Sequence, residues 1–502
     1  MSVVSAFFPL FFFLITVVKK LSKRHDKNKL RYKFNIKAKL AVWVLTCCVV
    51  VILNYPTTGI QAYTVNNKTL NQKLTLNLSQ VTDVDSVVGT DTDFFLSPED
   101  VSNEEVWKAV ADIGIPVLRF PGGQGNFYDW RMGNIQTSVK TRTVPMDAFM
   151  SHVRQVGTSV SYVLNITESP QRIRDLASYW KQTNAPVQWV EMGNEYFLFS
   201  QAIGGPVGYM QRCTQALQAL RAGGFQGPVG IHLAPFDAPG MPRFDYGLYW
   251  NEAIAMANTQ DFDAIILHYY PWVQTVGFYT DYREGPPVLI KTIKTLREKF
   301  PRKQVWVTEW NLGPPVDIPE FNSLVHAMLD LRMLHAMLDS RVNMSCYHVL
   351  TGTGWELLGP DRLTLEYSEN FGTKMLRRVT FFAFEELLKA QINGAYLEKQ
   401  MELNGLEYMA FIHNGEVRIV AWSPNGISTS VDLELPGYTT QFLGGEALRG
   451  QLLDTNGSLL SKDLDSLPWV EKIVPTPIDT PVLNGPSIVL LRFSVVPSPL
   501  SL

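Results

Sequence analysis

Two glutamates carry the clearest chemical signal in this chain of 502 residues. Glu195 ends the segment Val190-Glu191-Met192-Gly193-Asn194-Glu195, and Glu309 lies in Val305-Trp306-Val307-Thr308-Glu309-Trp310-Asn311. Each closes a short apolar run, which is typical of a buried parallel strand. Two carboxylates at the carboxyl ends of two barrel strands can act as proton donor and nucleophile on either side of a glycosidic bond. The pair therefore predicts cleavage of a glycoside through a covalent intermediate.

Polar residues also end two other apolar runs, where we expect them to join the glutamates. Side chains of a strand alternate between its two faces, so residues two apart point the same way. Four strand ends are then expected to deliver an arginine, a histidine, a tyrosine and the two glutamates to one mouth of a barrel. The sets expected on a common face are Val117 with Arg119, Glu191 with Gly193 and Glu195, His268 with Tyr270, and Val305 with Val307 and Glu309.

The elements that must position these residues alternate regularly between strand and helix from Val84 to about Leu388. Helical patterns occupy ranges such as Asn103–Ile113, Ile173–Gln182, Tyr209–Ala222 and Leu324–Asp339. Eight strands separated by helices predict an α/β fold, a (β/α)₈ TIM barrel. The expected strands are Val87–Val88 leading into Asp93, Val117–Phe120, Val160–Ile166, Val187–Glu191, Val229–Leu233, Ala264–Tyr270, Val305–Trp310 and Met344–Leu350.

The helical period disappears from about Tyr396, and short strands broken by turn residues take its place. This pattern predicts a C-terminal β-sandwich domain. Leu70–Val81 alternates apolar and polar residues and lacks a partner strand nearby, so we expect this N-terminal strand to join the sandwich. The predicted organisation is a targeting region over 1–62, the N-terminal strand within 63–83, a catalytic barrel over 84–394 and the sandwich over 395–502.

The first 62 residues are typical of a targeting region rather than of a folded domain. Val3–Val18 and Leu40–Leu53 are apolar, and the segment between them is basic. The second run suits the core of a signal peptide, and Ile60-Gln61-Ala62 is an acceptable cleavage site. We therefore expect an exported protein, either secreted or held to a membrane by this segment, with its catalytic domain outside the cytoplasm.

Charge and cysteine content exclude several classes of function. The net charge of the whole chain is −3, but residues 1–62 hold ten Lys and Arg and one acid, which leaves 34 basic and 46 acidic residues beyond them. A net charge of −12 argues against a nucleic-acid partner and is compatible with a neutral oligo- or polysaccharide. The four cysteines form no disulfide framework, and no pattern indicates a metal or another cofactor.

The motifs together resemble the clan A glycoside hydrolases, with the closest likeness to the α-L-arabinofuranosidase and β-xylosidase families. The resemblance runs from Leu118-Arg119-Phe120-Pro121-Gly122-Gly123, through Gly193-Asn194-Glu195 and Leu267-His268-Tyr269-Tyr270, to Thr308-Glu309-Trp310-Asn311. It implies a retaining glycosidase with Glu195 as acid/base and Glu309 as nucleophile. It also implies that Asn194 contacts the sugar 2-hydroxyl, and that Arg119 and Tyr270 hold Glu309.

Two loops depart from the arabinofuranosidase pattern. Gln124-Gly125 separates the glycine turn from Asn126, where the families usually place Asn directly after the turn. Tyr196-Phe197-Leu198-Phe199 follows Glu195 in place of a more polar segment. Because these loops border the sugar subsites, the sugar, the linkage, and exo or endo action stay open.

Other residues have two interpretations each. Asn165, at the end of a strand, either binds sugar hydroxyls or caps the helix that follows. Trp272, Trp310 and Trp355 follow strand ends and either stack on sugar faces or pack in the core. Two alternatives to hydrolysis also stay open: a transglycosylase, and a non-catalytic carbohydrate-binding surface protein. The sequence leaves the oligomeric state undetermined.

Overall fold

The computed structural model describes residues 70–76, 81–82, 86–92, 101–136, 141–235, 244–271, 278–311, 324–351, 356–360, 375–391, 395–397, 402–403, 406–423, 428–449, 475–483 and 487–498. All of them lie in one compact unit, residues 65–502. The predicted targeting region over 1–62 lies outside the described residues, as do the predicted domain borders near 83 and 394. Within the described ranges, no helix combines the length and the apolar character needed to cross a membrane.

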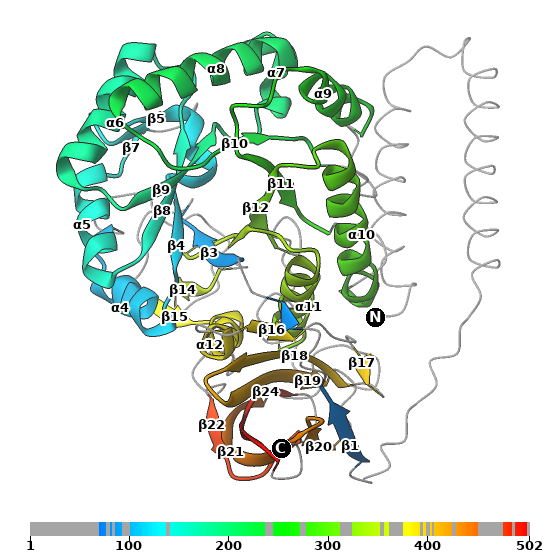
Figure 1. Cartoon of the computed structure of the whole chain (residues 1–502). Helices are drawn as coiled ribbons and strands as arrows, with labels where there is room; N and C mark the ends of the chain where they lie inside the picture. The colour runs from blue at the N-terminus through cyan, green and yellow to red at the C-terminus, as the bar shows by residue number, and fades with distance from the viewer. Residues whose placement is uncertain are drawn as a thin grey trace, which may run out of the picture. The chain divides into compact units, whose positions relative to one another are not determined.

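Eight parallel strands close into a barrel, which confirms the predicted fold class (Figure 1). Each predicted barrel strand is present with its ends shifted by a few residues at most, apart from β3, which ends before Asp93. The last strand, β13, pairs with the first, β3, and thereby closes the barrel. The strands are β3 (Val87–Asp91), β4 (Val117–Phe120), β8 (Ser159–Leu164), β9 (Val187–Met192), β10 (Val229–His232), β11 (Ala264–Tyr269), β12 (Gln304–Trp310) and β13 (Met344–Tyr347).

A cluster of apolar side chains fills part of the barrel interior, and buried polar side chains lie at the carboxyl ends of the strands. The interior cluster is small, and Trp306 and Met344 are its largest members. Gly89 belongs to this tightly packed region, because a Cβ atom on it would lie 2.2 Å from a methyl carbon of Val117. Its buried residues are Val117, Ala264, Ile266, Trp306, Met344 and Cys346.

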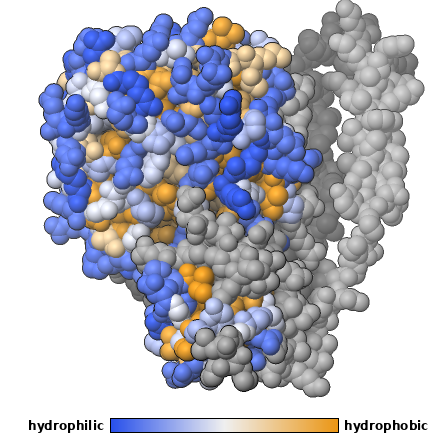
Figure 2. Space-filling view, in the orientation of Figure 1, coloured by the Kyte–Doolittle hydropathy of each residue, from blue (hydrophilic) through white to orange (hydrophobic). Residues whose placement is uncertain are grey.

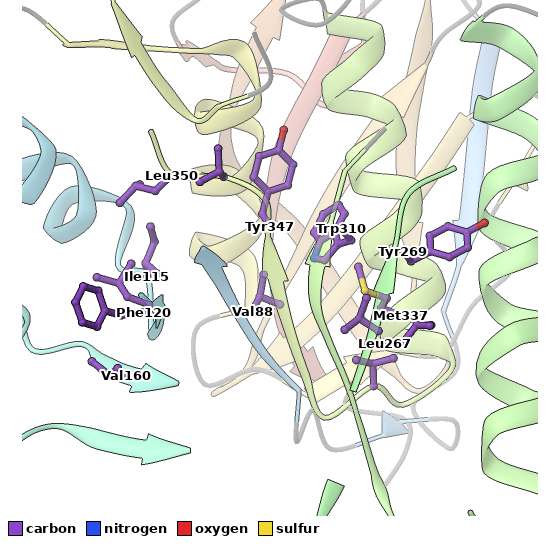
Figure 3. Close-up of a cluster of buried hydrophobic side chains, with 14 of the residues drawn as sticks. Val88, Ile115, Phe120, Val160, Leu267, Tyr269, Trp310, Met337, Tyr347 and Leu350 are labelled. Atoms are coloured by element: carbon purple, nitrogen blue, oxygen red, sulfur yellow. The ribbon is translucent and has the colours of Figure 1, made fainter. Parts of the chain in front are cut away.

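Helices cover the outside of the barrel and bury one face against the strands. In α4 (Glu104–Ile113), the Asn103 side chain accepts from the Glu105 amide at 3.1 Å, and Gly114 ends the helix with φ +70°. Figure 3 shows part of the resulting core, where side chains such as Val160 and Leu267 pack under the helix layer. The other long helices are α5 (Met146–Val156), α6 (Pro170–Thr183), α8 (Gly205–Gly223), α9 (Phe244–Met256), α10 (Phe278–Lys299), α11 (Leu324–Asp339) and α12 (Val379–Gln391).

The C-terminal part is a β-sandwich, as predicted. One sheet has the order β2-β16-β18-β19-β24-β21-β22, with β17 on β18, and the other has the order β1-β20-β23. The strands are β16 (Ala395–Leu397), β17 (Glu402–Leu403), β18 (Leu406–His413), β19 (Glu416–Ser423), β20 (Thr429–Glu434), β21 (Tyr438–Arg449), β22 (Thr476–Ile478), β23 (Val482–Leu483) and β24 (Ser487–Pro497).

The N-terminal strand joins this sandwich, which confirms the prediction for Leu70–Val81. β1 (Leu70–Thr75) runs parallel to β20, and Leu74 and Leu76 are buried in the sandwich core. The predicted segment is interrupted, since β2 (Val81–Thr82) pairs separately with β16. Two chain segments far apart in sequence therefore build one domain.

Helix α12 connects the barrel to the sandwich. Its Lys389 carbonyl accepts a hydrogen bond of 2.7 Å from Arg418 on β19, and the Lys389 ammonium lies 2.8 Å from Glu446 on β21. The surface view in Figure 2 shows that hydrophilic side chains dominate the described part of this face, with apolar side chains scattered between them.

Candidate active site

Glu195 reaches the barrel mouth through a turn and not from the strand itself. β9 ends at Met192, and Gly193 then takes a left-handed backbone with φ +76°. Glu195 is also left-handed, with φ +45°, a region that few residues other than glycine adopt. A Cβ atom on Gly193 would lie 2.2 Å from the Tyr196 ring, so only glycine fits this turn. The expectation that Glu191, Gly193 and Glu195 share a strand face is wrong for Glu195.

Glu309 reaches the same place through an irregularity in β12. Trp306 lies in the interior cluster, whereas Val305 and Val307 pack in the helix-side core. The expectation that Glu309 shares a face with these valines is therefore wrong. The pairing of β12 with β13 shifts in register between Val307 and Trp310, and this bulge turns Glu309 inward.

Arg119 forms a buried ion pair with Glu309. Its Nη1 atom donates to Oε1 of Glu309 at 2.7 Å and to Asp91 at 2.8 Å. Its Nε atom donates to Glu191 at 3.0 Å, and its Nη2 atom donates to Asn194 at 2.6 Å. The guanidinium is fully buried, and its charge lies against three carboxylates, those of Asp91, Glu191 and Glu309. The predicted link between Arg119 and Glu309 is present.

His268 and Tyr270 complete the surroundings of the two glutamates. The Tyr270 hydroxyl donates to Oε2 of Glu309 at 2.9 Å. Nδ1 of His268 lies 2.9 Å from Oε1 of Glu195 and 3.3 Å from Oε2 of Glu309. A carboxylate oxygen of Glu195 and one of Glu309 lie within 4.8 Å of each other. The structure thus brings together Arg119, Glu195, His268, Tyr270 and Glu309 as the sequence predicts.

The electrostatic surroundings keep Glu309 ionised. Burial alone would raise the pKa of its carboxyl group, but the charges of His268 and Arg119, with the Tyr270 hydroxyl bond, outweigh burial. The pKa of Glu309 is therefore held well below its usual range. The same site raises the pKa of Tyr270 well above its usual value, through burial and the charge of Glu309, so the phenol stays a donor.

A buried carboxylate under the site was missed by the sequence reasoning. Glu191 accepts from Ser161 at 2.9 Å, from Thr308 at 3.0 Å and from Arg119. Burial raises its pKa, but the charge of Arg119, together with the hydrogen bond of His232 and the charges of His232 and His268, outweighs burial and lowers the pKa to about 2. His232 lies 3.4 Å away, and burial lowers the pKa of its imidazole to about 4. An acidic residue inside the apolar run of β9 is the signal that could have found Glu191.

Asp91 and His348 were also missed. Asp91 ends β3 and is fully buried, and His348 follows β13, with its Nδ1 atom 3.1 Å from Asp91. The His348 ring meets the Tyr270 ring edge to face, with 6.0 Å between centroids. Asp91 ends a strand of the barrel, and that position was the available signal for it. Asp93, the residue expected at this end, lies outside the described part of the chain.

Asn194 is locked in place by a second asparagine. The backbone N–H of Asn194 donates to Oδ1 of Asn126 at 2.7 Å, and Nδ2 of Asn126 donates to the backbone carbonyl of Asn194 at 2.5 Å. The side-chain oxygen of Asn194 accepts from Arg119. Contact between Asn194 and a sugar hydroxyl stays a prediction.

Two further predicted residues do not join this group. Asn165 accepts from the backbone amide and the hydroxyl of Thr167, so its side chain stabilises the turn before α6. It does not cap the helix, because Ser169 is the N-cap residue and accepts from the Arg172 amide, and contact of Asn165 with a sugar stays a prediction. Trp310 is fully buried and packs on Tyr347 (Figure 3) and on Phe384. Its expected stacking role is wrong, because Trp310 is on the helix side of β12. Trp355, like Trp272, lies outside the described residues.

Three overlapping sets of side chains have the spacing of metal ligands among the described residues. Each set is part of the network above, and Arg119 already supplies a positive charge to Asp91, Glu191 and Glu309. The expectation that the site uses neither metal nor other cofactor stays a prediction. The sets are Glu191 with His232 and His268, Asp91 with Glu309 and His348, and Glu195 with His268 and Glu309.

The fold is that of the clan A TIM-barrel glycoside hydrolases, as the resemblance in the sequence implied. No protein-family model matches the chain, and no curated protein matches it in sequence. Solved structures do match it, at sequence identities that bear on the fold alone.

Arabinofuranosidases and xylosidases are among the similar structures. An α-L-arabinofuranosidase from Thermotoga maritima in complex with arabinose is 14% identical with a TM-score of 0.61, over 83% of this chain and 98% of that chain. A family 51 α-L-arabinofuranosidase from Bifidobacterium longum is 13% identical with a TM-score of 0.62, over 85% and 100%. A family 39 β-xylosidase from Caulobacter crescentus is 15% identical with a TM-score of 0.51, over 84% and 100%.

Proposed function

We propose that this chain is a retaining glycoside hydrolase that removes a terminal glycosyl residue, such as an arabinofuranoside or a xyloside. The observation that carries the proposal is the placement of Glu195 and Glu309, with oxygens within 4.8 Å of each other, at the mouth of one barrel. Retaining glycosidases separate their two carboxyl groups by about 5–5.5 Å, whereas inverting ones need about 6.5–9.5 Å.

The surroundings of each glutamate support its role in the first step. Glu309 is held ionised and oriented by Arg119 and Tyr270, so it attacks the anomeric carbon. Glu195 donates its proton to the oxygen of the departing group. A covalent glycosyl ester on Glu309 and a free leaving group result.

The second step reverses the role of Glu195. With Glu309 esterified, Glu195 is the carboxylate that takes a proton from water. The hydroxide attacks the anomeric carbon, the ester bond breaks, and Glu309 regains its charge. Two inversions give a sugar with its original anomeric configuration.

A panel of 4-nitrophenyl glycosides tests the proposal on the purified full chain. We expect release of nitrophenol from at least one arabinofuranoside, xyloside or related pyranoside, and NMR of the first product should show retention. Glu309→Gln, which keeps the shape of the side chain without its charge, is the control and should fall to background. Inverted product would contradict the retaining mechanism and indicate an inverting glycosidase. No turnover of any glycoside would contradict the proposal and favour a non-catalytic carbohydrate-binding protein. Added sugar acceptor separates hydrolysis from transglycosylation through the products formed.

A further inference from the structure

Two exposed phenylalanines contact each other beside Glu195. Phe127 is 44% exposed and Phe199 is 47% exposed, and their rings meet edge to face with centroids 6.4 Å apart. Leu198, next to Phe199, is 36% exposed. Phe127, Leu198 and Phe199 form what we term the mouth patch. Single exposed apolar side chains are common, but a pair in contact is less so.

The mouth patch is fixed to the active-site frame. Phe127 ends the 3₁₀ helix η2 (Gly122–Phe127), which follows β4, and Phe199 ends η3 (Tyr196–Phe199), which follows Glu195. The paired hydrogen bonds between Asn126 and Asn194 tie η2 to the end of β9. Both phenylalanines therefore lie at the same end of the barrel as Glu195.

The neighbours of the patch along the chain are buried, so its exposure is not a sign of a loose segment. Tyr196 packs against Tyr209, and Phe197 meets Trp250 edge to face at 6.4 Å. These two rings hold η3 against the barrel, and η3 then presents Leu198 and Phe199 to solvent. A 3₁₀ helix rises about 2 Å per residue, which places Phe199 about 8 Å along the chain direction from Glu195.

The position beside the proton donor identifies what the patch meets. The acid/base must contact the oxygen of the departing group, so the aglycone leaves from the side of Glu195. Phenylalanine and leucine side chains have no hydrogen-bonding groups, so the three residues of the patch offer apolar contact and no polar recognition. Apolar groups instead gain from losing contact with water there.

We propose that the mouth patch binds an apolar aglycone, so that the substrates are alkyl, aryl or similar hydrophobic glycosides; this rests on the proposed function. The patch then acts as a specificity-determining surface. It should discriminate between aglycones by apolar area and be indifferent to the sugar. Binding of this kind acts on the ground state and the transition state alike, so it should lower KM more than it raises kcat.

Methyl and hexyl glycosides of one sugar test the inference, because the two alcohols leave with similar chemistry and differ in apolar area. The sugar is the one that the 4-nitrophenyl panel selects. We expect the full chain to prefer the hexyl glycoside by about tenfold or more in kcat/KM. Phe127→Ala and Phe199→Ala should each lower the hexyl-to-methyl ratio, and the double variant should bring it to about 1–2. Met256→Ala, which removes an apolar side chain that is 84% exposed at the C-terminal end of α9, should leave the ratio unchanged.

Several results would overturn the inference. An equal kcat/KM for both glycosides would exclude an apolar aglycone site, and so would a loss of activity in the Phe variants that is the same for both substrates. Size-exclusion chromatography with light scattering tests whether a second copy of the chain occupies the patch instead. If the chain were a dimer that Phe199→Ala dissociates, and the hexyl-to-methyl ratio in kcat/KM were unchanged, the patch would be a dimer interface. If no 4-nitrophenyl glycoside is cleaved, the proposed function itself fails, which is a separate outcome.

Discussion

Glu195 and Glu309 come from β9 and β12, yet a carboxylate oxygen of one lies within 4.8 Å of an oxygen of the other. The His268 imidazole lies between them, with its Nδ1 atom 2.9 Å from Glu195 and 3.3 Å from Glu309. Their surroundings differ, since Glu309 also contacts Arg119 and Tyr270, while the Glu195 side chain is 23% exposed. This asymmetry supports the different roles that we propose for the two carboxylates.

Substitution of Glu195 by alanine should slow turnover in a way that azide reverses. A nitrophenol leaves without protonation, so the glycosyl ester still forms, but it then waits for unassisted water. Azide needs no general base and fits the space left by the removed side chain. We expect azide to restore much of the rate on nitrophenyl glycosides and to give a glycosyl azide of retained configuration, which NMR identifies.

Glu309→Ala serves as the matched comparison. It should lose turnover on every substrate, because no other group at the site can form the ester, and any azide product should have the inverted configuration. Retained glycosyl azide from Glu309→Ala would reverse the assignment of the two roles.

Removal of Arg119 should destabilise the fold as well as stop catalysis. Arg119→Met leaves Asp91, Glu191 and Glu309 buried without their common cation, and loss of one partner of a buried ion pair costs about 3–5 kcal/mol. Urea unfolding followed by fluorescence measures the change. Arg172→Met is the control, since Arg172 is partly exposed beside Asp129 and such pairs contribute about 0–1 kcal/mol. Equal losses in the two variants would contradict the buried charge network.

The pH dependence of stability should reveal the buried His232. Burial lowers its pKa from 6.5 to about 4, so between these values the unfolded chain binds a proton that the folded chain does not. The free energy of unfolding should therefore fall as the pH drops from about 6.5 to about 4, by about 3 kcal/mol in total from this residue. His232→Gln removes that contribution, and urea unfolding across this range should show a flatter profile than wild type.

The half-buried His413 of β18 provides the control for this experiment. His413→Gln makes the same substitution in the sandwich, outside the charge network of the barrel, and its unfolding is measured over the same pH range. If His413→Gln flattened the pH dependence of the free energy of unfolding as much as His232→Gln does, the pH dependence could not be attributed to the buried His232.

The sequence predicted the barrel because each strand is a compact apolar run and each helix has a regular apolar face. The same period failed at the two glutamates for which we propose catalytic roles. Glu309 turns inward only because of the bulge between Val307 and Trp310, and Glu195 lies in a left-handed turn beyond β9. The alternation of side chains within one strand contains no information on either feature. The bulge arises from the pairing of β12 with β13, and the turn lies beyond the end of β9. Glu191 was missed for a related reason, because its partner Arg119 comes from another strand.

Trp310 offers a direct test of the strand faces around the bulge. The side chain is fully buried, stacks on Phe384 and meets Tyr347 edge to face, so it belongs to the core between β12 and the helix layer. Trp310→Ala should therefore lower the free energy of unfolding by about 3–5 kcal/mol, and Trp310→Phe, which keeps a ring there, should lose less. Because no sugar reaches this ring, KM of the folded Trp310→Phe enzyme for its nitrophenyl glycoside should stay within about twofold of wild type. A Trp310→Phe enzyme of wild-type stability with a strongly raised KM would instead place the ring against the sugar, and would put the bulge at another position in β12.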